Sequence, residues 1–295
     1  MMEGASQPAS LAAIVIPHFN DTARLRKCLA ALAPQVAGRR VETVVVDNGS
    51  TEDIGTLHGD FPWVRFLTEP ARGAAPARNT GVAGSRAPWL FFIDADCVPA
   101  PDWLDTALGL GGWDGIIGGR VDLFDETPPP RSGAEAFETV FAFPQRMYVE
   151  RKRFSVTANL LTTRAVFAAT GPFDGSLVED SDWCHRAGRL GYGVRYHPEL
   201  AVSHPTRSDW AALARKWRRV TIENFHANGT DLRARARWAL RALAMPASIP
   251  LHLPRALGSP RLATAGERLR CAGTLIRLRL LRMAWMLRQA ATGSP

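Results

Sequence analysis

The stretch Trp89–Pro99, WLFFIDADCVP, decides the fold, because an apolar run there ends in two carboxylates. An apolar run without polar alternation is typical of a strand that is buried on both faces of a parallel sheet. Asp94 and Asp96 then follow the carboxyl end of that strand, where open α/β sheets bind their ligands. Taken alone, the pair fits a site for Mn²⁺ or Mg²⁺ that also needs phosphate oxygens, or a helix cap beside a solvated carboxylate.

Earlier segments of the chain have the same strand character, and amphipathic segments separate them. Strands are expected at Leu11–Phe19, Val41–Val46 and Val64–Thr68. Asn20 or Asp21 is expected to cap the first helix, and Ser50 with Asp53 has the spacing of a capping box that opens the next helix. Strands and helices that alternate every 25 residues or so, about one βαβ unit, predict an α/β fold with a mostly parallel central sheet flanked by helices. The sequence has neither a GxGxxG nor a Walker A loop, so an ordinary dinucleotide or ATP cradle is not supported.

The second half of the chain continues with further short elements. Strands are expected at Gly115–Phe124, Val156–Thr162 and Gly193–His197, and helices at Pro101–Leu110, Arg164–Thr170, Glu179–Leu190 and Ser208–Asn228. Asp125–Gly133 contains three consecutive prolines and is expected to be a loop, whereas Phe137–Phe154 has no clear period and receives no assignment. Residues 11–228 are therefore predicted to form one large domain, and residues 229–295 a basic helical extension.

The predicted helix Glu179–Leu190 carries carboxylates at Glu179, Asp180 and Asp182 in its first turn. Negative charge is favourable at a helix N-terminus, and this alone would explain the pattern structurally. Carboxylates this close together also raise one another's pKa, which is how a general base is tuned to neutral pH. Both interpretations stand at this point.

Composition limits the classes of protein that the chain can belong to. A hydrophobic content of 46% is ample for a core, and the cysteines Cys28, Cys97, Cys184 and Cys271 form no CxxC pair. Zinc and a disulfide framework are therefore not expected, and a reducing cytosol is the natural setting. Residues 1–10 are small and polar, are expected to lack regular structure, and do not have the layout of a signal peptide.

Charge is distributed unevenly along the chain. Residues 1–206 contain 19 basic and 24 acidic residues, whereas residues 207–295 contain 17 basic and 4 acidic residues. A cationic segment of this kind is attracted to anionic surfaces. Its basic residues are not interleaved with aromatic residues in a pattern typical of a nucleic-acid groove, so nucleic-acid binding is not expected.

Taken in order, the motifs resemble those of family 2 glycosyltransferases of the GT-A fold. The resemblance rests on IVIPHFN at Ile14–Asn20, VVDNGST at Val45–Thr51, Arg72-Gly73 with Ala77-Arg78-Asn79, Asp94-Ala95-Asp96, and Glu179-Asp180. It covers residues 11–228, and the ordered spacing is more specific than any single motif. It implies transfer of a sugar from a nucleotide-diphosphate sugar to an acceptor hydroxyl with inversion, as in the synthesis of cell-surface polysaccharides or glycolipids.

The resemblance also implies roles for individual residues. The nucleotide-sugar-binding set is Pro17, Phe19, Asn20, Asp47, Asn48, Arg72, Arg78, Asp94 and Ala95. Asp94 and Asp96 match the DxD motif that holds Mn²⁺ or Mg²⁺ against the diphosphate, and Asp180 matches the catalytic base. These roles agree with the chemistry, because a nucleoside diphosphate leaves readily only when metal and cationic donors neutralise its developing charge. A single general base, together with a leaving group that a metal ion assists, is the arrangement of a direct displacement. The sequence shows no residue in a position to act as the nucleophile of a covalent route.

Two departures from the family pattern, and one histidine that agrees with it, bear on the resemblance. The second Asp that is usual after the second strand is Asn48 here, so less charge is available for base recognition. His204 falls where related enzymes often have a metal- or phosphate-contacting histidine, although a lone His is frequently structural. Lys216-Trp217-Arg218-Arg219 replaces the Gln-x-x-Arg-Trp motif of members that act on polymers, which favours single addition over processive synthesis.

Two rival interpretations remain. Ile93–Val98 also fits the hhhDxDx[TV] nucleophile motif of haloacid-dehalogenase-type phosphohydrolases, in which Asp94 would be phosphorylated. That motif normally follows the first strand, however, and no GDxxxD-like acidic pair comes after it here. The second rival is a non-catalytic relative that retains the fold to bind nucleotide sugars, against which the retention of both acidic sites argues.

The C-terminal part of the chain, from Ser208 onward, has apolar surfaces that suit several kinds of partner. In Ser208–Asn228, a face of Trp210, Leu213, Trp217, Val220 and Asn224 is expected to point inward. Further on, a narrow stripe of Leu269, Ile276, Leu280, Met283 and Leu287 is flanked by arginines. Such a stripe is suited to lying on an anionic membrane through residues 255–291, which would agree with a lipid-linked acceptor, although a saccharide acceptor is also expected. The stripe is equally suited to packing on the body of the protein or to forming a homodimer. A cytoplasmic protein, peripheral on the inner face of the plasma membrane, is the corresponding expectation.

Overall fold

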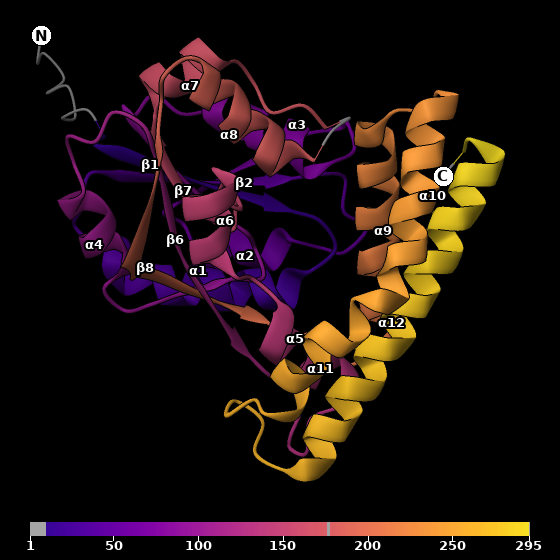
Figure 1. The fold of residues 1–295 in the computed structure, drawn as a ribbon. Helices are drawn as coiled ribbons and strands as arrows, with labels where there is room; N and C mark the ends of the chain where they lie inside the picture. Colours follow the sequence, from indigo (N-terminus) through magenta and orange to yellow (C-terminus); the bar gives the residue numbers. More distant parts are fainter. Residues whose placement is uncertain (1–9, 176–177, 295) are drawn as a thin grey trace, which may run out of the picture. The chain divides into compact units, whose positions relative to one another are not determined.

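The computed structural model describes residues 10–175 and 178–294, so residues 1–9 of the N-terminal segment 1–10 lie outside the described residues. The chain divides into two compact units (Figure 1). Among the described residues, the first unit comprises residues 10–122, 144–175 and 179–204, and the second mainly residues 123–143 and 205–294. The domain boundary predicted at residue 228 falls within the second unit, and it stays a prediction.

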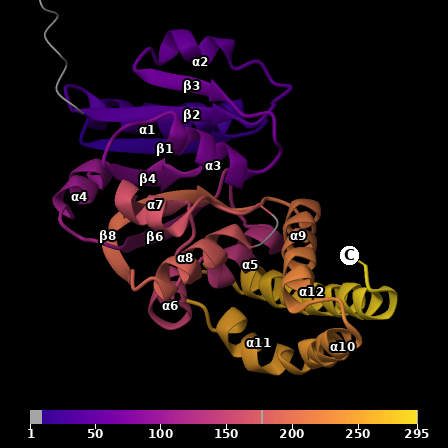
Figure 2. The same cartoon turned by 90° about the horizontal axis from the view of Figure 1, so that it is seen from above.

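The first unit contains the parallel half of the sheet. Its strands are β1 (Ala12–His18), β2 (Val41–Asp47), β3 (Val64–Thr68) and β4 (Trp89–Ile93), and its helices are α1 (Thr22–Val36), α2 (Gly55–Asp60) and α3 (Ala74–Ala83). These strands pair in parallel in the order β3-β2-β1-β4, as the alternating pattern predicts, and Figure 2 shows them in that sequence. His18 is in register with Asp47, and Asp47 with Thr68, so the carboxyl ends of the strands meet at one edge.

The rest of the sheet is mixed in direction. Its elements are β5 (Val98–Pro99), α4 (Trp103–Gly109), β6 (Ile116–Phe124), α6 (Gln145–Lys152), β7 (Asn159–Thr163), α7 (Arg164–Thr170), α8 (Glu179–Arg189) and β8 (Val194–Pro205). Strand β7 lies antiparallel between β4 and β6, and β8 runs antiparallel to β5. The predicted α/β fold class is confirmed, with an antiparallel half joined to the parallel one. Strand β8 is longer than predicted because its later part pairs with β5.

Two of the predicted helix caps are wrong. Asp21 precedes α1, but its side chain makes no capping hydrogen bond. The capping box predicted at Ser50 and Asp53 does not form, because α2 begins only at Gly55. Instead, Ser50 Oγ accepts a hydrogen bond from the Asn20 N–H at 2.8 Å, and Asp53 Oδ1 accepts one from the Gly55 N–H at 2.7 Å. These side chains therefore stabilise the loop rather than the helix.

The core of the first unit brings α3 against the sheet. A Cβ atom at Gly81 would collide with Cγ1 of Val15, so glycine is needed where this helix packs against β1. On the same face, Phe92 packs edge-to-face against Phe173, with ring centroids 5.3 Å apart, and Phe173 lies next to the buried Trp183 of α8. Helices α3 and α8 are thus fixed on the same sheet.

The second unit is mainly helical. Its helices are α5 (Gly133–Phe141), α9 (Trp210–Asn228), α10 (Leu232–Ala247), α11 (Ile249–Leu257) and α12 (Ala265–Thr292). The end of α5 and the whole of α6 occupy the segment Phe137–Phe154, in which no clear hydrophobic period was found. Helix α5 starts with a capping box between Ser132 and Glu135, and Glu138 is buried with ion pairs to Arg207 and Lys216. The predicted basic helical extension is confirmed.

The inner face of α9 differs from the predicted one beyond Trp217. Leu213 is buried as predicted, but Asn224 is exposed, and Thr221 and Phe225 take the inward positions. The physical reason is that Phe225 packs against Trp238 of α10, with ring centroids 5.8 Å apart. The polar Asn224 is therefore left on the surface.

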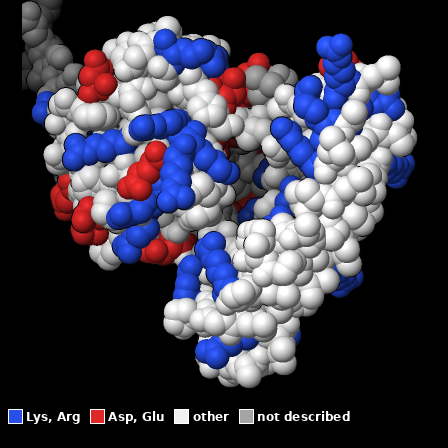
Figure 3. All heavy atoms as spheres, in the orientation of Figure 1, with Lys and Arg blue, Asp and Glu red and all other residues white. Residues whose placement is uncertain are grey.

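Helix α12 is apolar on two sides. It packs through Cys271, Leu275, Leu278 and Met286, which are not the residues of the predicted stripe. Of that stripe, Met283 and Leu287 contact the core, whereas Leu269, Ile276 and Leu280 are exposed. Figure 3 shows Lys and Arg side chains around broad uncharged areas on these helices. Among the helices that the structure describes, none has both the length and the apolar character needed to cross a bilayer.

Candidate active site

The carboxylates that follow β4 lie at the carboxyl edge of the sheet, as predicted. Asp94, Ala95 and Asp96 form a turn after Ile93. The side chains of Asp94 and Asp96 are partly exposed, whereas Ala95 between them is buried. Alternate residues of this turn therefore offer carboxylate oxygens to a ligand, while the residue between them anchors the turn.

Arg78 of α3 joins the two acidic sites that the sequence predicted separately. It is only 3% exposed. Its Nη2 donates to Asp94 Oδ1 at 2.6 Å, and its Nη1 donates to Oε1 of Glu179, in the first turn of α8. Burial would lower the pKa of Arg78, but the carboxylates of Asp94, Glu179 and Asp180 outweigh it and raise this pKa. The guanidinium is therefore a permanent cation at the centre of the site.

Asp180 has the properties of a general base. Burial raises the pKa of its carboxyl to about 7; Arg78 opposes that shift, and the charges of Glu179 and Asp94 add to it. Thr157 Oγ1 donates a hydrogen bond to Asp180 Oδ1 at 2.8 Å. The predicted direction of the shift is thus confirmed, with burial rather than neighbouring charge as the largest cause. A carboxylate with a pKa near neutrality accepts a proton efficiently at physiological pH.

The other acidic residue in this turn has a different function. Asp182 Oδ2 accepts a hydrogen bond from Arg186 Nε at 2.7 Å, one helical turn further along α8. This ion pair stabilises the helix and leaves Asp180 as the carboxylate that faces Thr157.

The residues predicted to hold a metal ion are only partly brought together. His204 Nε2 lies 3.2 Å from Asp96 Oδ2, while Asp94 is directed to Arg78. Within the described ranges 10–175 and 178–294, no group of three or more His, Cys, Asp or Glu side chains is arranged so that it could hold a metal ion. Two carboxylates and an imidazole are nevertheless suitable donors for Mn²⁺. The donor set fits the ion chemically.

A second group of residues lies at the ends of β1 and β2. Asp47 Oδ2 accepts a hydrogen bond from the Ser50 N–H at 3.2 Å, but its buried Oδ1 has no partner among the described residues. His18, its neighbour in register, is buried with both ring nitrogens unpaired, and burial lowers its pKa although Asp47 opposes the shift. Phe19 follows with a ring that is 52% exposed. An unsatisfied oxygen beside an exposed ring is suited to a polar aromatic ligand.

Asn20 connects two loops beside these residues. Its backbone has φ = 47°, which Asn tolerates better than most residues. Its Oδ1 accepts hydrogen bonds from the N–H groups of Thr51 at 2.7 Å and Glu52 at 3.2 Å. Of the other predicted residues, Pro17 lies within β1 and Arg72 is exposed.

Asn48 uses its whole side-chain amide to hold the backbone. Its Nδ2 donates to the carbonyl oxygens of Glu69 at 2.9 Å and Ala71 at 2.6 Å, and its Oδ1 accepts from the Gly73 N–H at 2.7 Å. An aspartate could not donate to the two carbonyl groups. The departure from the family pattern at this position therefore has a structural basis.

Sequence reasoning missed His18 and Thr157 as site residues. His18 stood inside a quoted motif, next to Phe19, and its position at the end of a strand was the signal that could have selected it. Thr157 was assigned to the strand Val156–Thr162, but β7 begins only at Asn159, and Thr157 lies in the preceding turn. Its contact with Asp180 depends on the tertiary fold, and the sequence carried no signal for it.

The curled α/β sheet with these carboxylates at its edge has the GT-A fold, as its likeness to solved structures of that fold shows. The model of the family described as Glycosyl transferase family 2 matches residues 13–169, more than half of the chain, and the chain belongs to this family. The resemblance inferred from the motifs is thereby confirmed. Because Asp94 follows the fourth strand along the chain rather than the first, and lies within the matched residues, the phosphohydrolase interpretation loses its basis.

Individual relatives support the same class. The chain is 26% identical over 215 residues to the glycosyltransferase AglE of Haloferax volcanii, with 70% of each chain covered. It is 28% identical over 216 residues to the pre-mycofactocin glycosyltransferase of Mycobacterium tuberculosis, covering 68% of this chain but 44% of that relative. The structure of the mannosyltransferase PcManGT from Pyrobaculum calidifontis, in complex with GDP-Man and Mn²⁺, aligns with a TM-score of 0.53 at 16% identity, covering 97% of this chain and 74% of that one. This last likeness concerns the fold.

Proposed function

We propose that the protein transfers a sugar from a nucleotide-diphosphate sugar to an acceptor hydroxyl, with inversion and with the assistance of a divalent metal ion. The observation that carries the proposal is the contact of Arg78 with both Asp94 and Glu179. This contact ties the turn that would hold the donor's diphosphate to the helix turn that contains Asp180. A base with a pKa of about 7 is thus associated with a cationic, carboxylate-lined site.

On the donor side, the ends of β1 and β2 would bind the nucleoside. The exposed ring of Phe19 would stack on the base, and the unpaired Oδ1 of Asp47 would accept a hydrogen bond from the base or ribose. Pro17 and Asn20 would shape this end of the site, and Arg72 would approach the phosphates from its exposed loop. Asn48 would act indirectly, by holding the loop after β3 in place, because its side-chain amide is hydrogen-bonded to backbone groups of that loop.

Asp94, Asp96 and His204 would hold Mn²⁺ or Mg²⁺ when the donor is bound. The metal ion would supply charge neutralisation for the departing diphosphate. Arg78 contributes a second, permanent positive charge that is desolvated and held in place by two carboxylates. That the solved relative PcManGT was obtained with GDP-Man and Mn²⁺ supports a nucleotide-sugar donor and this metal chemistry.

On the acceptor side, Asp180 would remove the proton from the attacking hydroxyl. The hydrogen bond from Thr157 orients one oxygen of Asp180 and leaves its other oxygen for the acceptor. A single base of this kind suits one direct displacement with inversion. We place no covalent intermediate on the path, because neither the motifs nor the site residues described above supply a nucleophile for one.

The setting that we propose is cell-surface polysaccharide or glycolipid synthesis at the inner face of the plasma membrane, with a saccharide or lipid-linked acceptor. Residues 255–291 would contact an anionic membrane, because they contain the exposed Leu269, Ile276 and Leu280 in a strongly basic segment. Exposed aliphatic side chains among arginines are favourable at a lipid interface, whereas they are less favourable against water. A homodimer through the same surface is the competing arrangement.

The proposal can be tested by incubating the protein with a panel of uridine-, guanosine- and thymidine-diphosphate sugars, with Mn²⁺ or with EDTA, and measuring nucleoside diphosphate release. We expect release from one donor, dependent on the metal, and reduced at least a hundredfold in Asp180→Asn and Asp96→Asn, in line with the roughly 10²-fold or larger contribution of such groups. Asp182→Asn is the matched control, because that carboxylate pairs with Arg186 within α8.

Other outcomes would distinguish the alternatives. Donor binding without turnover in any condition, with the same affinity in Asp180→Asn, would favour the non-catalytic relative. Metal-independent release of inorganic phosphate would overturn the transferase proposal itself.

A further inference from the structure

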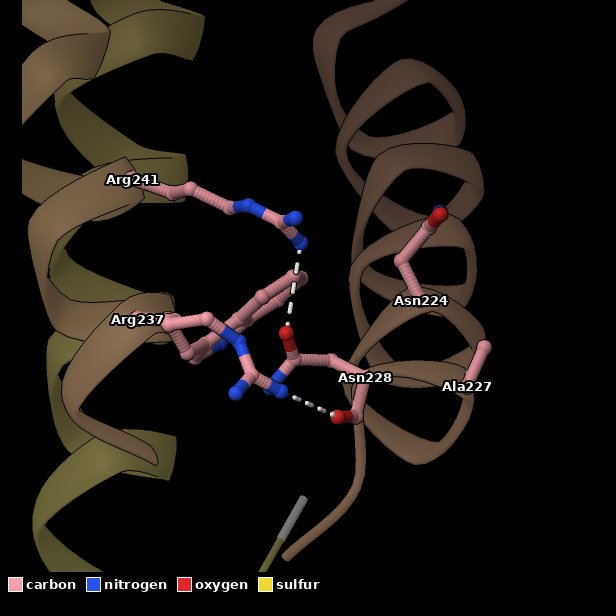
Figure 4. A pocket seen from close by; sticks show the side chains of 6 residues that line it. Asn224, Ala227, Asn228, Arg237 and Arg241 are labelled. Carbon is pink, nitrogen blue, oxygen red and sulfur yellow. Dashed lines mark hydrogen bonds between the residues drawn. The ribbon is translucent and has the colours of Figure 1, made fainter. Parts of the chain in front are cut away.

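The second unit contains a pocket whose lining shares no residue with the candidate active site. It is formed between α9 and α10 and has a volume of about 310 Å³. Figure 4 shows its lining, which consists of Asn224, Ala227, Asn228, Arg237, Trp238 and Arg241. Arg237 and Arg241 are one helical turn apart on α10, and Asn224 and Asn228 are one turn apart on α9. The pocket therefore presents two guanidinium groups toward Asn228, whereas the amide of Asn224 donates to the Val220 carbonyl oxygen of its own helix (Figure 4).

The two guanidinium groups are held by the same residue. Arg241 Nη1 donates to Asn228 Oδ1 at 3.2 Å, and Arg237 Nη2 lies 3.5 Å from the Asn228 carbonyl oxygen. Asn228 is itself fixed, because its Nδ2 donates to the Ala234 carbonyl oxygen at 2.8 Å. Each contact uses one N–H of an arginine, so several donors of each fork remain available. The two guanidinium groups are therefore held in position while several of their N–H groups remain available to a ligand.

Neither arginine forms a salt bridge with a carboxylate among the described residues. The carboxylate of Asp231 interacts electrostatically with Arg237. The same carboxylate also caps α10, because it accepts hydrogen bonds from the N–H groups of Arg233 and Ala234. The pocket thus combines two guanidinium groups, of which Arg237 is partly offset by Asp231, and planar guanidinium forks match the geometry of phosphate oxygens. Phosphate is the ligand chemistry that this lining recognises.

The solvent-exposed face of α10 indicates where that phosphate comes from. Leu232, Leu240 and Leu243 of the same helix are 79%, 68% and 60% exposed. A soluble phosphate would gain nothing from these side chains, whereas a lipid would bring its headgroup to the arginines and its acyl chains to the leucines. We infer that the pocket binds the phosphate of an anionic membrane lipid, with Leu240 and Leu243 entering the apolar layer. The inference adds a specific lipid site on α10 to the membrane contact proposed for residues 255–291, and it rests on that proposal.

The experiment compares the full chain and two charge-matched variants on vesicles. Arg237→Gln/Arg241→Gln removes the pocket cations, and Arg215→Gln/Arg233→Gln removes two exposed arginines that lie outside both the pocket and residues 255–291. The vesicles are phosphatidylcholine with phosphatidic acid, or phosphatidylcholine with oleate at equal negative charge. On phosphatidic acid we expect the pocket variant to lose about tenfold or more in affinity, the order expected when two arginines are removed from a membrane surface. The control variant should lose less than about threefold, because its arginines lie outside the proposed lipid site. On oleate the two variants should behave alike. Thermal unfolding of both variants checks that they fold.

Further arms separate the lipid from a soluble phosphate. Leu240→Ser/Leu243→Ser should weaken vesicle binding and leave a calorimetric titration with inorganic phosphate unchanged. Equal loss in both arginine variants on phosphatidic acid would overturn the inference, because charge alone would then explain binding. Tight binding of inorganic phosphate without vesicle binding would overturn it too.

The inference can also fail while the membrane proposal stands. If vesicle binding persists in the pocket variant but is lost in Ile276→Ser/Leu280→Ser, the membrane contact lies on α12 and the pocket has no part in it.

Discussion

At the residue scale, Asp180 combines two opposing properties. Its pKa of about 7 means that ionisation costs free energy in the folded protein, because the unfolded chain ionises this group near pH 3.8. The contribution of Asp180 to stability is therefore present below that lower pKa and is lost as the pH rises toward about 7. The catalytic role that we propose needs the ionised form, so stability and activity change in opposite directions with pH.

Asp180→Asn is expected to lower kcat by about 10²–10⁴-fold, the usual contribution of a general base. The same substitution should raise the free energy of unfolding at pH 8 by about 1–3 kcal/mol, because it removes a poorly solvated charge while leaving an oxygen for Thr157. At pH 4 the difference should disappear. Initial rates and thermal unfolding at both pH values are the measurements, and a variant that is less stable at pH 8 would contradict this account.

The dependence of rate on pH gives a second prediction. We expect kcat to rise with pH through a midpoint near the pKa of Asp180, about 7, and to fall tenfold per pH unit well below it. Rates measured with a saturating metal and donor from pH 5 to pH 9 would show this limb, and Asp182→Asn should leave it in place. A flat profile over that range would exclude Asp180 as the titrating base.

Asn48→Asp gives a third prediction, since the substitution restores the residue that is usual in the family. Here it would place carboxylate oxygens against the carbonyl oxygens of Glu69 and Ala71 and remove both hydrogen bonds. We expect a loss of about 1–3 kcal/mol in stability, the cost of leaving buried acceptors unsatisfied, together with weaker donor binding. Chemical unfolding and donor titration would measure the two effects. Tighter donor binding in the variant would instead indicate that position 48 contacts the ligand.

Some of the candidate site residues could be predicted from the sequence, whereas the contacts between them could not. Asp94, Asp96 and Asp180 could be selected because each follows a strand or opens a helix, which is a local property. The contact of Arg78 with both acidic sites was not predictable, since it joins positions 101 residues apart. The brace made by Asn48 was missed for a similar reason, because its partners belong to another loop.

At the element scale, Arg78 connects α3 to α8. Arg78→Gln is expected to shift the rising limb of the pH–rate profile to higher pH, because this guanidinium opposes the upward shift of the Asp180 pKa. It should also cost about 1–3 kcal/mol in stability, less than a fully buried pair, since Asp94 and Glu179 are partly exposed. The pH profile separates an electrostatic role from a purely structural one: an unshifted midpoint with reduced stability would leave Arg78 as a structural link only.

Elements also show why the sequence predicted some segments well and others poorly. Strands β1 and β4 contain continuous apolar runs and β2 and β3 are rich in apolar and β-branched residues, and their predicted limits agree with the observed ones within one residue at each end. The face of α9 was misjudged at Asn224, because Phe225 turns toward Trp238, a partner on another helix. Periodicity shows that a helix has a buried side, and packing partners determine which side it is.

At the scale of the whole molecule, the uneven distribution of charge predicts salt-sensitive membrane binding. Residues 207–295 carry 17 basic and 4 acidic residues, so electrostatic attraction should dominate the approach to anionic vesicles. Raising the ionic strength shortens the Debye length from about 10 Å at 0.1 M to about 3 Å at 1 M, and binding should weaken steeply. Sedimentation with vesicles across this range is the measurement, with neutral vesicles as the control. Binding that is indifferent to salt would point to the exposed leucines alone.

The reversal of strand direction between β4 and β7 has a consequence for how such proteins diversify. On the roles proposed here, the recognition of the nucleotide belongs to β1, β2 and the Asp94–Asp96 turn, which precede the reversal, and the base Asp180 follows it. The connecting segment after β5 is therefore a natural crossover point for recombination. Chimaeras exchanged there between family members should inherit the donor preference of one parent and the acceptor preference of the other, provided that Arg78 and Glu179 are kept as a matched pair.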